Sequence, residues 1–319
     1  MDVGKQESPR TLMRTQRHPV NFQGTMAIMF CLELPMSRIS DNADLFETPQ
    51  STVRPPGILV GCAGWSLATP VQPHFPGEGS HLERYAGVLP AVEINSSFYR
   101  PHRPATYARW RDSVPPQFRF SLKLPREITH QQRLRDTGDL VDTFLDAAGN
   151  LGDRFGCLLV QMPPSLPFDA ATAHGLFSHL RSRLRAGIAC EPRHQSWFGP
   201  EAADLLERFQ VARVIADPEV ALDPAPVQYQ DIVYVRLHGS PVIYHSVYSD
   251  AFLRRNAAWL LEQHRLGRQV WCIFDNTASG AAVPNALATL AYVTAPQAMR
   301  FQRGGGGGGE PRGGGGGPG

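Results

Sequence analysis

Residues 232–240 read Ile-Val-Tyr-Val-Arg-Leu-His-Gly-Ser, and polar and apolar side chains alternate along this stretch. Because successive side chains of a strand point to opposite faces, the polar residues share one face and the apolar residues share the other. The polar set is Tyr234, Arg236 and His238, and the apolar set is Val233, Val235 and Leu237. The apolar face suits packing beneath helices, so this stretch predicts a strand of an α/β protein whose polar face points inward.

Seven other short apolar runs recur along the chain, and a stretch of helical character usually follows each of them. Strands that alternate with helices imply parallel pairing through right-handed crossovers. The predicted strands are Ile58–Gly64, Ala91–Phe98, Phe118–Pro125, Cys157–Pro164, Gly187–His194, Ala212–Pro218, Ile232–Ser240 and Val270–Thr277. The predicted helices are His81–Leu89, Pro104–Ser113, Asp139–Leu151, Asp169–Leu184, Pro200–Phe209, Ser249–His264 and Pro284–Tyr292.

Eight strands in about 240 residues predict an α/β fold, a single (β/α)8 TIM-type barrel. The interval 219–231 is too short and too rich in proline to predict a helix. A doubly wound open sheet is the alternative fold. Such a sheet normally has a glycine-rich phosphate turn after its first strand, and Gly61-Cys62-Ala63-Gly64 does not fit that motif.

Composition limits what the rest of the chain can be. Of the 319 residues, 42% are hydrophobic, which excludes global disorder, and the net charge of +2 argues against a basic nucleic-acid coat. We expect a flexible N-terminal segment at 1–56, the barrel at 57–296 and a flexible glycine-rich tail at 297–319. Four of the 5 cysteines lie in separate apolar, strand-like runs, and such buried free thiols favour a cytoplasmic location. No apolar run is long enough to span a membrane, so no membrane partner is expected.

Polar side chains mark the C-terminal half of every strand after the first, on one parity of the alternation. The C-terminal ends of barrel strands form the mouth, where barrel enzymes carry their active sites. We therefore predict one polar cluster there, with the catalytic candidates Glu93, Lys123, Glu191, Asp217, His238 and Asp275. The substrate-binding candidates are Asn95, Tyr99, His130, Gln161, Arg193, His194, Arg236, Gly239, Ser240 and Asn276. A closed structural network of paired charges is the alternative interpretation of the cluster.

Lys123 is unusual because the chain contains only two lysines, Lys5 and Lys123, among its 31 basic residues. A chain that otherwise uses arginine for positive charge favours a role for Lys123 that arginine does not fill. Proton transfer and Schiff-base formation are such roles. The alternative is a codon accident, with Lys123 paired to Glu93 or Asn95.

The loops after the last two predicted strands favour binding of a small anion. Barrels often bind phosphate there, and Gly239, Ser240 and Asn276 lie among small residues whose N–H groups can approach an anion. Arg193 and Arg236 would add bidentate charge, and an ordinary glycine turn is the alternative. No cofactor is expected. Carboxylates and histidines suit a divalent metal, but the neighbouring cations argue against a dense metal cage.

Several longer strings resemble the YecE-like family, catalogued as domain of unknown function 72. They are GCAGWS (61–66), VEINSSFYR (92–100), ITH (128–130), VQMPPS (160–165), EPRHQSW (191–197), VRLHG (235–239) and NT (276–277), with Gly280-Ala281 and Asn285-Ala286. The resemblance extends from about Gly57 to Pro296 and implies a barrel fold but no activity. Two positions depart from the family pattern. Asp275 stands where the pattern Phe-Asn-Asn is expected, and His74-Phe75-Pro76 stands where a Tyr-Pro pair is expected.

Three functions are compatible with these residues. The first is an enzyme acting on a small phosphorylated or sugar-like molecule by acid–base chemistry, with Glu93 or Glu191 as general base and Arg236 binding the anion. The second is a nucleic-acid-processing or binding protein, which the near-neutral charge disfavours. The third is a non-catalytic ligand-binding barrel, because the fold alone does not select a chemistry. The sequence does not indicate the oligomeric state.

Overall fold

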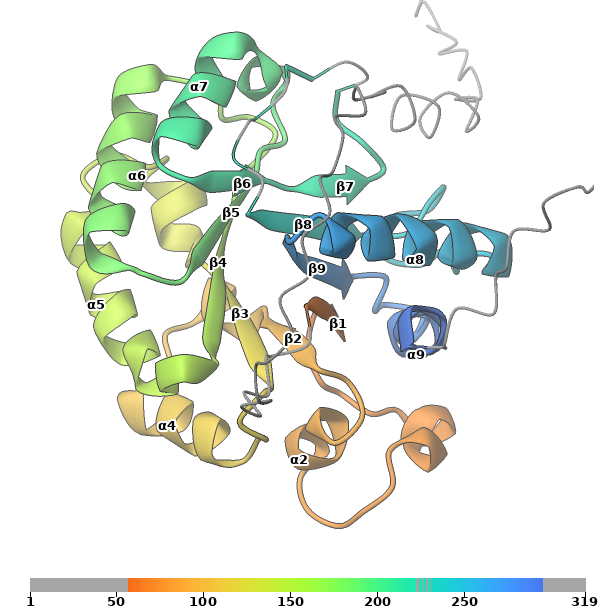
Figure 1. Ribbon diagram of the computed structural model, residues 1–319. Coiled ribbons are helices and arrows are strands. Elements are labelled where there is room, and N and C mark those ends of the chain that lie inside the picture. Colours follow the sequence, from red (N-terminus) through yellow and green to blue (C-terminus); the bar gives the residue numbers. More distant parts are fainter. Residues whose placement is uncertain (1–56, 222–223, 226, 228, 230, 295–319) are drawn as a thin grey trace, which may run out of the picture. The chain divides into compact units, whose positions relative to one another are not determined.

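The computed structural model describes residues 57–221, 224–225, 227, 229 and 231–294. The predicted flexible segments at 1–56 and 297–319 lie outside the described residues, as do positions 295–296 at the end of the predicted barrel. Within the described residues, strands and helices alternate along the chain (Figure 1).

A parallel sheet lies at the centre of the fold, and every pair of neighbouring strands in it runs in the same direction. The first strand of the chain pairs with both the second and the last. The strands are β1 (Ile58–Cys62), β2 (Ala91–Ile94), β3 (Arg119–Lys123), β4 (Phe155–Gln161), β5 (Gly187–Glu191), β6 (Val211–Arg213), β7 (Ile215–Asp217), β8 (Ile232–Leu237) and β9 (Gln269–Phe274).

The two ends of the sheet are β6 and β7, which follow each other in the chain with only Val214 between them. The N–H of Val214 donates to the carbonyl of Cys190 at 2.8 Å, which continues the pairing with β5. On its other side β7 pairs with β8. The segments β6 and β7 are therefore two halves of one interrupted strand, the sixth that the sequence predicts. Joined through it, the sheet forms the predicted (β/α)8 TIM-type barrel, and the open doubly wound alternative is wrong.

Helices cover the outside of the sheet, as the ring from α4 to α7 shows (Figure 1). No helix forms among the described residues of 219–231, as the proline-rich sequence indicates. The helices are α2 (His81–Ala86), α3 (Ser96–Tyr99), α4 (Pro104–Asp112), α5 (Gly138–Ala148), α6 (Ala170–Arg183), α7 (Pro200–Arg208), α8 (Asp250–Arg265) and α9 (Ala282–Thr294). Shorter helical turns are η2 (Thr69–His74), η3 (Glu127–Gln131), η4 (Gly149–Arg154) and η5 (Gln195–Phe198).

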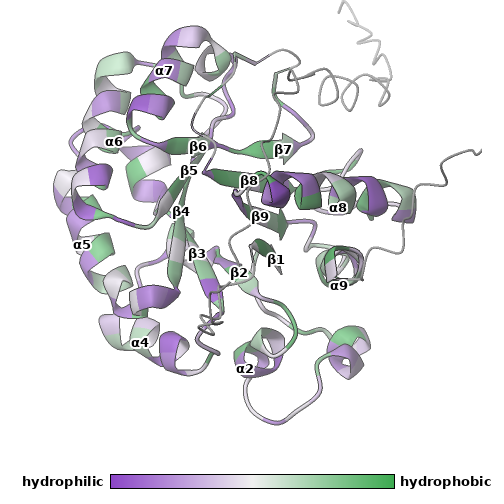
Figure 2. Cartoon of the chain, in the orientation of Figure 1, coloured by the Kyte–Doolittle hydropathy of each residue, from purple (hydrophilic) through white to green (hydrophobic). Residues whose placement is uncertain are grey.

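Two apolar clusters lie on opposite sides of the sheet, and the strands that separate them are largely hydrophobic (Figure 2). The larger cluster packs between sheet and helices and contains the predicted outer-face residues Val233, Val235 and Leu237. The smaller cluster occupies the barrel interior. Its members are Leu59, Ala91, Cys157, Leu159, Ala189, Ala212, Val214, Ile232, Tyr234, Trp271 and Ile273. At the C-terminal strand ends, the same interior face carries ionisable groups.

Strands β1 and β2 approach each other closely at Gly61. A Cβ at this position would lie 2.1 Å from the carbonyl oxygen of Ala91, so no side chain fits there. Tyr85 of α2 holds the same point, because its hydroxyl donates to the carbonyl of Ala91 at 3.0 Å and accepts from the N–H of Cys62 at 2.8 Å. This contact fixes the start of β2, the strand that carries Glu93.

The described cysteines are free thiols. Cys62, Cys157, Cys190 and Cys272 are all buried in separate strands. Among the residues that the structure describes, no helix has both the length and the apolar character that a membrane span requires.

Candidate active site

Arg236 of β8 lies at the centre of a buried network, and 0% of its side chain is exposed. Its Nη2 and Nε donate to the two carboxylate oxygens of Glu93 at 2.7 and 3.0 Å. Its Nη1 donates to Oε2 of Glu191, and Nη2 also donates to Oδ2 of Asp275 at 3.1 Å. Carboxylates from the ends of β2, β5 and β9 thus surround one guanidinium.

His238, one residue after β8, lies between two of these carboxylates. Its Nδ1 is 2.9 Å from Oδ2 of Asp275, and its Nε2 is 2.9 Å from Oε1 of Glu191. Burial alone would lower the pKa of His238, but the hydrogen bonds to Asp275 and Glu191 outweigh burial and raise the pKa. A carboxylate at each ring nitrogen favours the imidazolium form, which has a proton on both nitrogens.

Arg193 connects this network to the surface. Its Nε and Nη2 donate to Oε1 of Glu191 at 3.1 and 2.8 Å, and 20% of its side chain is exposed. Burial acts to raise the pKa of Glu191, but the charge of Arg236 and the hydrogen bond from His238 hold that pKa well below its ordinary value. Glu191 is therefore a carboxylate at neutral pH.

Tyr234 and Ser121 also belong to the network. Neither was among the predicted site residues. The Tyr234 hydroxyl lies 2.9 Å from Oε2 of Glu93 and 2.7 Å from the Ser121 hydroxyl. Both residues lie on the predicted interior parity, two positions before Arg236 on β8 and before Lys123 on β3. The alternation that predicted the cluster was therefore the signal that could have identified them.

Lys123 ends β3 at the edge of this network and is only 8% exposed. Its Nζ lies 4.3 Å from the centre of the Phe98 ring, and no ion pair or hydrogen bond of Nζ is found within the described part of the chain. Burial and then the charge of Arg236 lower the pKa of Lys123 from 10.5 to about 8. The alternative in which Lys123 pairs with Glu93 or Asn95 is wrong, because Glu93 binds Arg236 instead and the side-chain oxygen of Asn95 has no hydrogen-bond partner.

The structure contradicts the predicted orientation of Asp217. Strand register pairs Ala216 with Arg236 and Asp217 with Leu237. Because neighbours in register point to the same side, the small Ala216 faces the interior beside the bulky Arg236, and Asp217 faces the helices. There Oδ2 of Asp217 accepts a hydrogen bond from the Tyr248 hydroxyl at 2.6 Å. Polarity alone therefore selected the wrong residue of this interrupted strand: it selected Asp217, whereas Ala216 faces the interior.

Three further predicted substrate-binding residues lie in different surroundings. Gln161 is in register with Glu191 and therefore faces the interior. The ring of His130, in η3, lies edge-on to Phe98 with centroids 5.0 Å apart. His194 lies past β5 and hydrogen-bonds to the Ser196 hydroxyl at 2.9 Å.

The predicted second strand is too long at its C-terminal end. It stops at Ile94, Asn95 precedes α3, and Tyr99 lies on that short helix with 69% of its surface exposed. The predicted strand Ala91–Phe98 therefore extends too far, because Ser97 and Phe98 lie on α3.

The loops expected to bind an anion instead bind each other. The Gly239 N–H donates to the Tyr248 hydroxyl at 2.8 Å, and the Ala278 N–H donates to the carbonyl of Tyr244 at 3.1 Å. The side-chain amide of Asn276 donates to the carbonyl of Ser246 at 2.9 Å. Ser240 follows Gly239 in this loop and is partly buried.

The guanidinium of Arg236, also expected to bind the anion, is instead hydrogen-bonded to carboxylates of the protein. Each of its three nitrogens donates to a carboxylate, so of the two arginines expected to bind an anion, Arg193 is the one with exposed surface. The Arg236 guanidinium occupies the point at which the carboxylates of Glu93, Glu191 and Asp275 converge. Among the described residues, no group of three or more His, Cys, Asp or Glu side chains is arranged to hold a metal ion.

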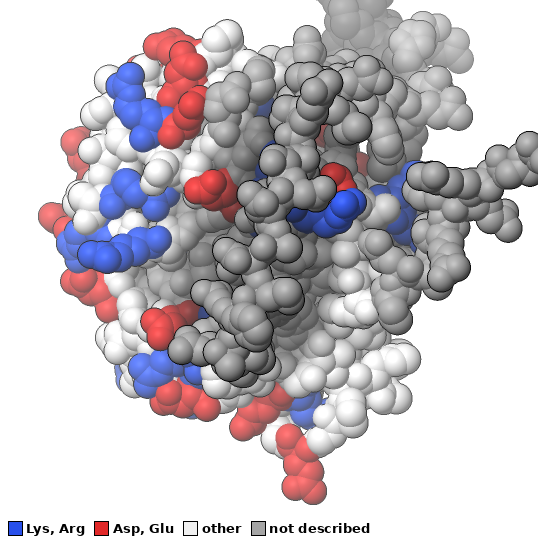
Figure 3. Space-filling view, viewed as in Figure 1, with Lys and Arg blue, Asp and Glu red and all other residues white. Residues whose placement is uncertain are grey.

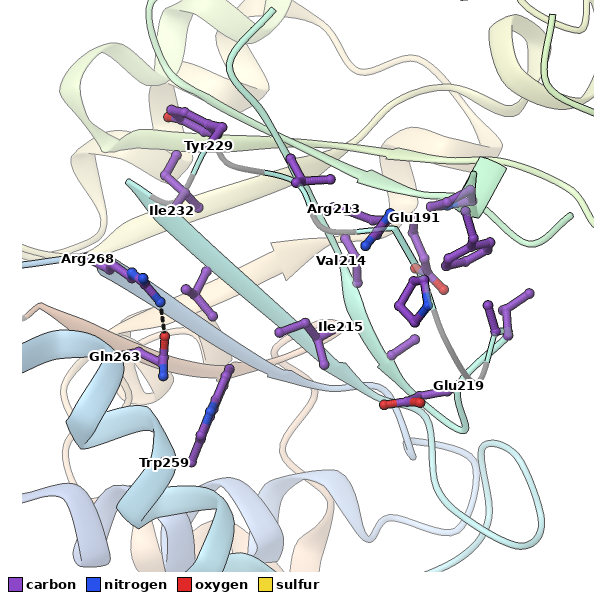
Figure 4. Close-up of a pocket in the computed structure, with 18 residues that line it drawn as sticks. Glu191, Arg213, Val214, Ile215, Glu219, Tyr229, Ile232, Trp259, Gln263 and Arg268 are labelled. Carbon is purple, nitrogen blue, oxygen red and sulfur yellow. Dashed lines mark hydrogen bonds between the residues drawn. The ribbon is translucent and has the colours of Figure 1, made fainter. Parts of the chain in front are cut away.

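Two cavities lie near the network. A cavity of about 860 Å³ is lined by Phe98, residues of α5 and the exposed side chains of Arg100, Arg103 and Arg126. A smaller cavity of about 250 Å³ is lined by residues of β7, of β8 and of the described part of the segment between them, and Figure 4 shows Arg268 hydrogen-bonded to Gln263 on one side of it. On the face in Figure 3, acidic and basic side chains are interspersed.

The fold and the site together define a (β/α)8 barrel protein with a buried Arg–carboxylate–His network at the C-terminal ends of its strands. Residues 59–304 match the family described as "Protein of unknown function DUF72". This match covers most of the chain, and the chain belongs to the DUF72 family. The resemblance to YecE-like proteins is thereby confirmed.

Individual relatives agree with this assignment. The UPF0759 protein YecE of Escherichia coli K12 is 32% identical over 166 residues, which are 50% of this chain and 59% of YecE. YunF of Bacillus subtilis is 23% identical over 260 residues, or 72% of this chain and 92% of YunF. The chain thus spans less than two thirds of YecE.

Solved structures of two DUF72 family proteins share the fold. The protein from Enterococcus faecalis V583 has a TM-score of 0.62 at 22% identity, covering 74% of this chain and 95% of its own. The protein from Thermotoga maritima MSB8 has a TM-score of 0.61 at 23% identity, covering 73% and 97%. At this identity the likeness concerns the fold alone.

Proposed function

We propose that this barrel is an enzyme that converts a small anionic molecule, phosphorylated or sugar-like, by acid–base chemistry at the barrel mouth. The observation that carries the proposal is the state of Lys123. Its amine is almost fully buried and has no carboxylate partner among the described residues. Burying an unpaired cation costs stability, so a chain that needed only structural charge would use a paired arginine here.

The lowered pKa of Lys123, about 8, supports a role in proton transfer. A general base works best when its pKa is near the working pH, because it is then both available and basic enough. Glu191 fits this role less well than the sequence predicts, since its pKa lies well below the ordinary value. In this proposal Glu93 and Glu191 hold Arg236 and His238 in place, and Lys123 moves the proton.

Positive charge near the mouth supports an anionic substrate. Arg193 keeps part of its side chain exposed, and Lys123 lies against Phe98, a ring that also lines the larger cavity, where three arginines outnumber Glu127 and Asp146. Arg100, Arg103 and Arg126 on that lining would bind the distal part of a longer anion. The buried free thiols support work in a reducing compartment.

The experiment is untargeted turnover. The purified full-length protein is incubated with a mixture of cellular metabolites, and their depletion is followed by mass spectrometry. We expect the wild type and the Lys5→Met variant to deplete the same compound, and the Lys123→Met variant to do so about 100-fold more slowly or worse. Lys5→Met is the matched control because it makes the same change at the only other lysine. Equal turnover by Lys123→Met, or no depletion by the wild type, would contradict the proposal.

A further inference from the structure

We propose that Lys123 acts covalently, by forming an imine with an aldehyde or ketone group of the substrate. This inference rests on the proposed function and narrows its substrate class to carbonyl compounds that carry an anionic group. In a protein, imine formation is favoured at a primary amine that is buried from bulk water, free of a fixed ionic partner and held in one place. Lys123 meets these three conditions.

The amine is free to react because its neighbours bind other groups. The carboxylates of Glu93, Glu191 and Asp275 all accept hydrogen bonds from Arg236. The Nζ of Lys123 instead lies over the face of Phe98 at 4.3 Å. An aromatic face attracts an ammonium only weakly. When Lys123 leaves the ring of Phe98 to react, no buried carboxylate loses its partner.

The backbone of Lys123 is held firmly in place. The Ser97 hydroxyl, on α3, lies 2.7 Å from the carbonyl oxygen of Lys123 and 2.9 Å from that of Ile94. This hydroxyl is buried and connects the ends of β2 and β3, so Phe98 and Lys123 keep their relative positions. A nucleophile on the end of a barrel strand is held more precisely than one on a loop.

The environment also favours the neutral amine. Burial and the nearby positive charge of Arg236 disfavour the ammonium form of Lys123, and the three carboxylates only partly offset them. Arginine at this position would keep its charge and could form no imine. The use of lysine at this one barrel position, in a chain with 31 basic residues and only two lysines, fits a covalent role better than a structural one.

The chemistry balances without an added oxidant or reductant. The neutral amine of Lys123 adds to the carbonyl carbon, a C–N bond forms, and the π electrons move to oxygen. Protons pass from nitrogen to that oxygen, which leaves as water. Overall, one neutral amine and one carbonyl give one neutral imine and one water, and both hydrogens of the water come from the amine. Asp275 interacts electrostatically with Lys123 and is hydrogen-bonded to His238, so the charge of this pair acts on the reacting amine.

The test is reductive trapping on the full-length protein. Dihydroxyacetone phosphate or glyoxylate is added with cyanoborohydride, and adducts are located by intact mass and peptide mapping. The chain has two lysines besides its α-amino group, so peptide mapping resolves each primary amine. We expect an adduct at Lys123 that forms roughly 10–100-fold faster than the adduct at Lys5 near neutral pH, because more of the Lys123 amine is neutral. Glycerol 3-phosphate, which has no carbonyl, should add no mass, and Lys123→Arg should remove the adduct.

The outcomes separate this inference from the proposed function. Labelling of Lys5 at the same rate as Lys123, or no labelling of Lys123, overturns the imine inference. If labelling fails while Lys123→Met still loses the turnover that Lys5→Met keeps, Lys123 acts only as an acid or base, and the proposed function stands. If Lys123→Met keeps its turnover, the proposed function fails. Melting curves of both Lys123 variants exclude unfolding as the cause of a lost adduct.

Discussion

The Nδ1 atom of His238 lies 2.9 Å from Oδ2 of Asp275, a position at which the family pattern leads us to expect asparagine. An asparagine carbonyl would accept the same hydrogen bond, but it carries no charge. The carboxylate of Asp275 therefore adds a negative charge that stabilises the imidazolium and also faces Arg236 at 3.1 Å. Burial raises the pKa of Asp275, yet Arg236 and His238 outweigh burial and lower it, so this charge persists at neutral pH.

Replacing this carboxylate by its amide should change the titration of His238. In Asp275→Asn, the hydrogen bond at Nδ1 remains but its charge is lost, so we expect the pKa of His238 to fall relative to the wild type. NMR titration of the ring protons measures the change. Arg254 pairs with the exposed Asp250, and Asp250→Asn serves as the control that should leave the His238 titration unchanged. An unshifted His238 in Asp275→Asn would show that Glu191 alone sets its pKa.

The lowered pKa of Lys123 predicts a pH dependence of stability. Between about pH 8 and pH 10.5, the unfolded chain holds a proton on Lys123 that the folded chain has released. Stability rises with pH wherever the unfolded state binds more protons, so this residue makes the protein more stable as pH rises through that window. A shift from 10.5 to about 8 corresponds to roughly 3 kcal/mol.

Urea unfolding at several pH values checks this prediction. Tyrosines also titrate in the window, so the quantity to compare is the difference in unfolding free energy between wild type and Lys123→Met. We expect the unfolding free energy of the wild type to increase relative to that of the variant as pH rises from 8 to 10.5. A difference that stays constant would mean that Lys123 keeps its ordinary pKa in the folded protein, and the proton-transfer proposal would lose its main support.

The sequence predicted the barrel and most of the network because both follow from a period of two. Strands with one apolar face must bury it under helices, which leaves Glu93, Lys123, Glu191, Arg236 and Asp275 on the inside. Which carboxylate meets which cation depends on the stagger between strands and on rotamers, and neither is visible in one sequence.

Two errors have local causes. The sixth strand is interrupted at Val214, and a small apolar residue, Ala216, occupies the interior position beside Arg236, so the polarity rule pointed Asp217 the wrong way. At the end of the second strand, α3 begins at Ser96, which takes Ser97 and Phe98 out of the strand alternation. A strand break and an early helix start both depend on tertiary packing, which the local pattern does not encode.

The outward orientation of Asp217 predicts a mild effect of substitution. Asp217→Asn keeps an oxygen that can accept the hydrogen bond from Tyr248, and the side chain touches none of the buried carboxylates or Arg236. We expect turnover of any substrate found for the wild type to change by less than about threefold, whereas Asp275→Asn should reduce it more. A loss in Asp217→Asn as large as that in Asp275→Asn would return Asp217 to the catalytic group.

Removing the central cation should be far more damaging than removing a surface one. In Arg236→Met, the carboxylates of Glu93, Glu191 and Asp275 would face one another in a buried space without their shared partner. Breaking a buried ion pair by removing one partner costs about 3–5 kcal/mol, because an uncompensated charge stays buried.

The matched control is Arg254→Met, which removes an equal side chain from an exposed pair with Asp250 and should change stability little, because exposed ion pairs contribute little. Urea unfolding at neutral pH compares the two variants. Lowering the pH should reduce the difference in unfolding free energy between the two variants, because protonated carboxylates no longer repel one another. If Arg236→Met were as stable as Arg254→Met at neutral pH, the three carboxylates would have to be protonated or hydrated in the folded protein, and the network would not be the charged centre described above.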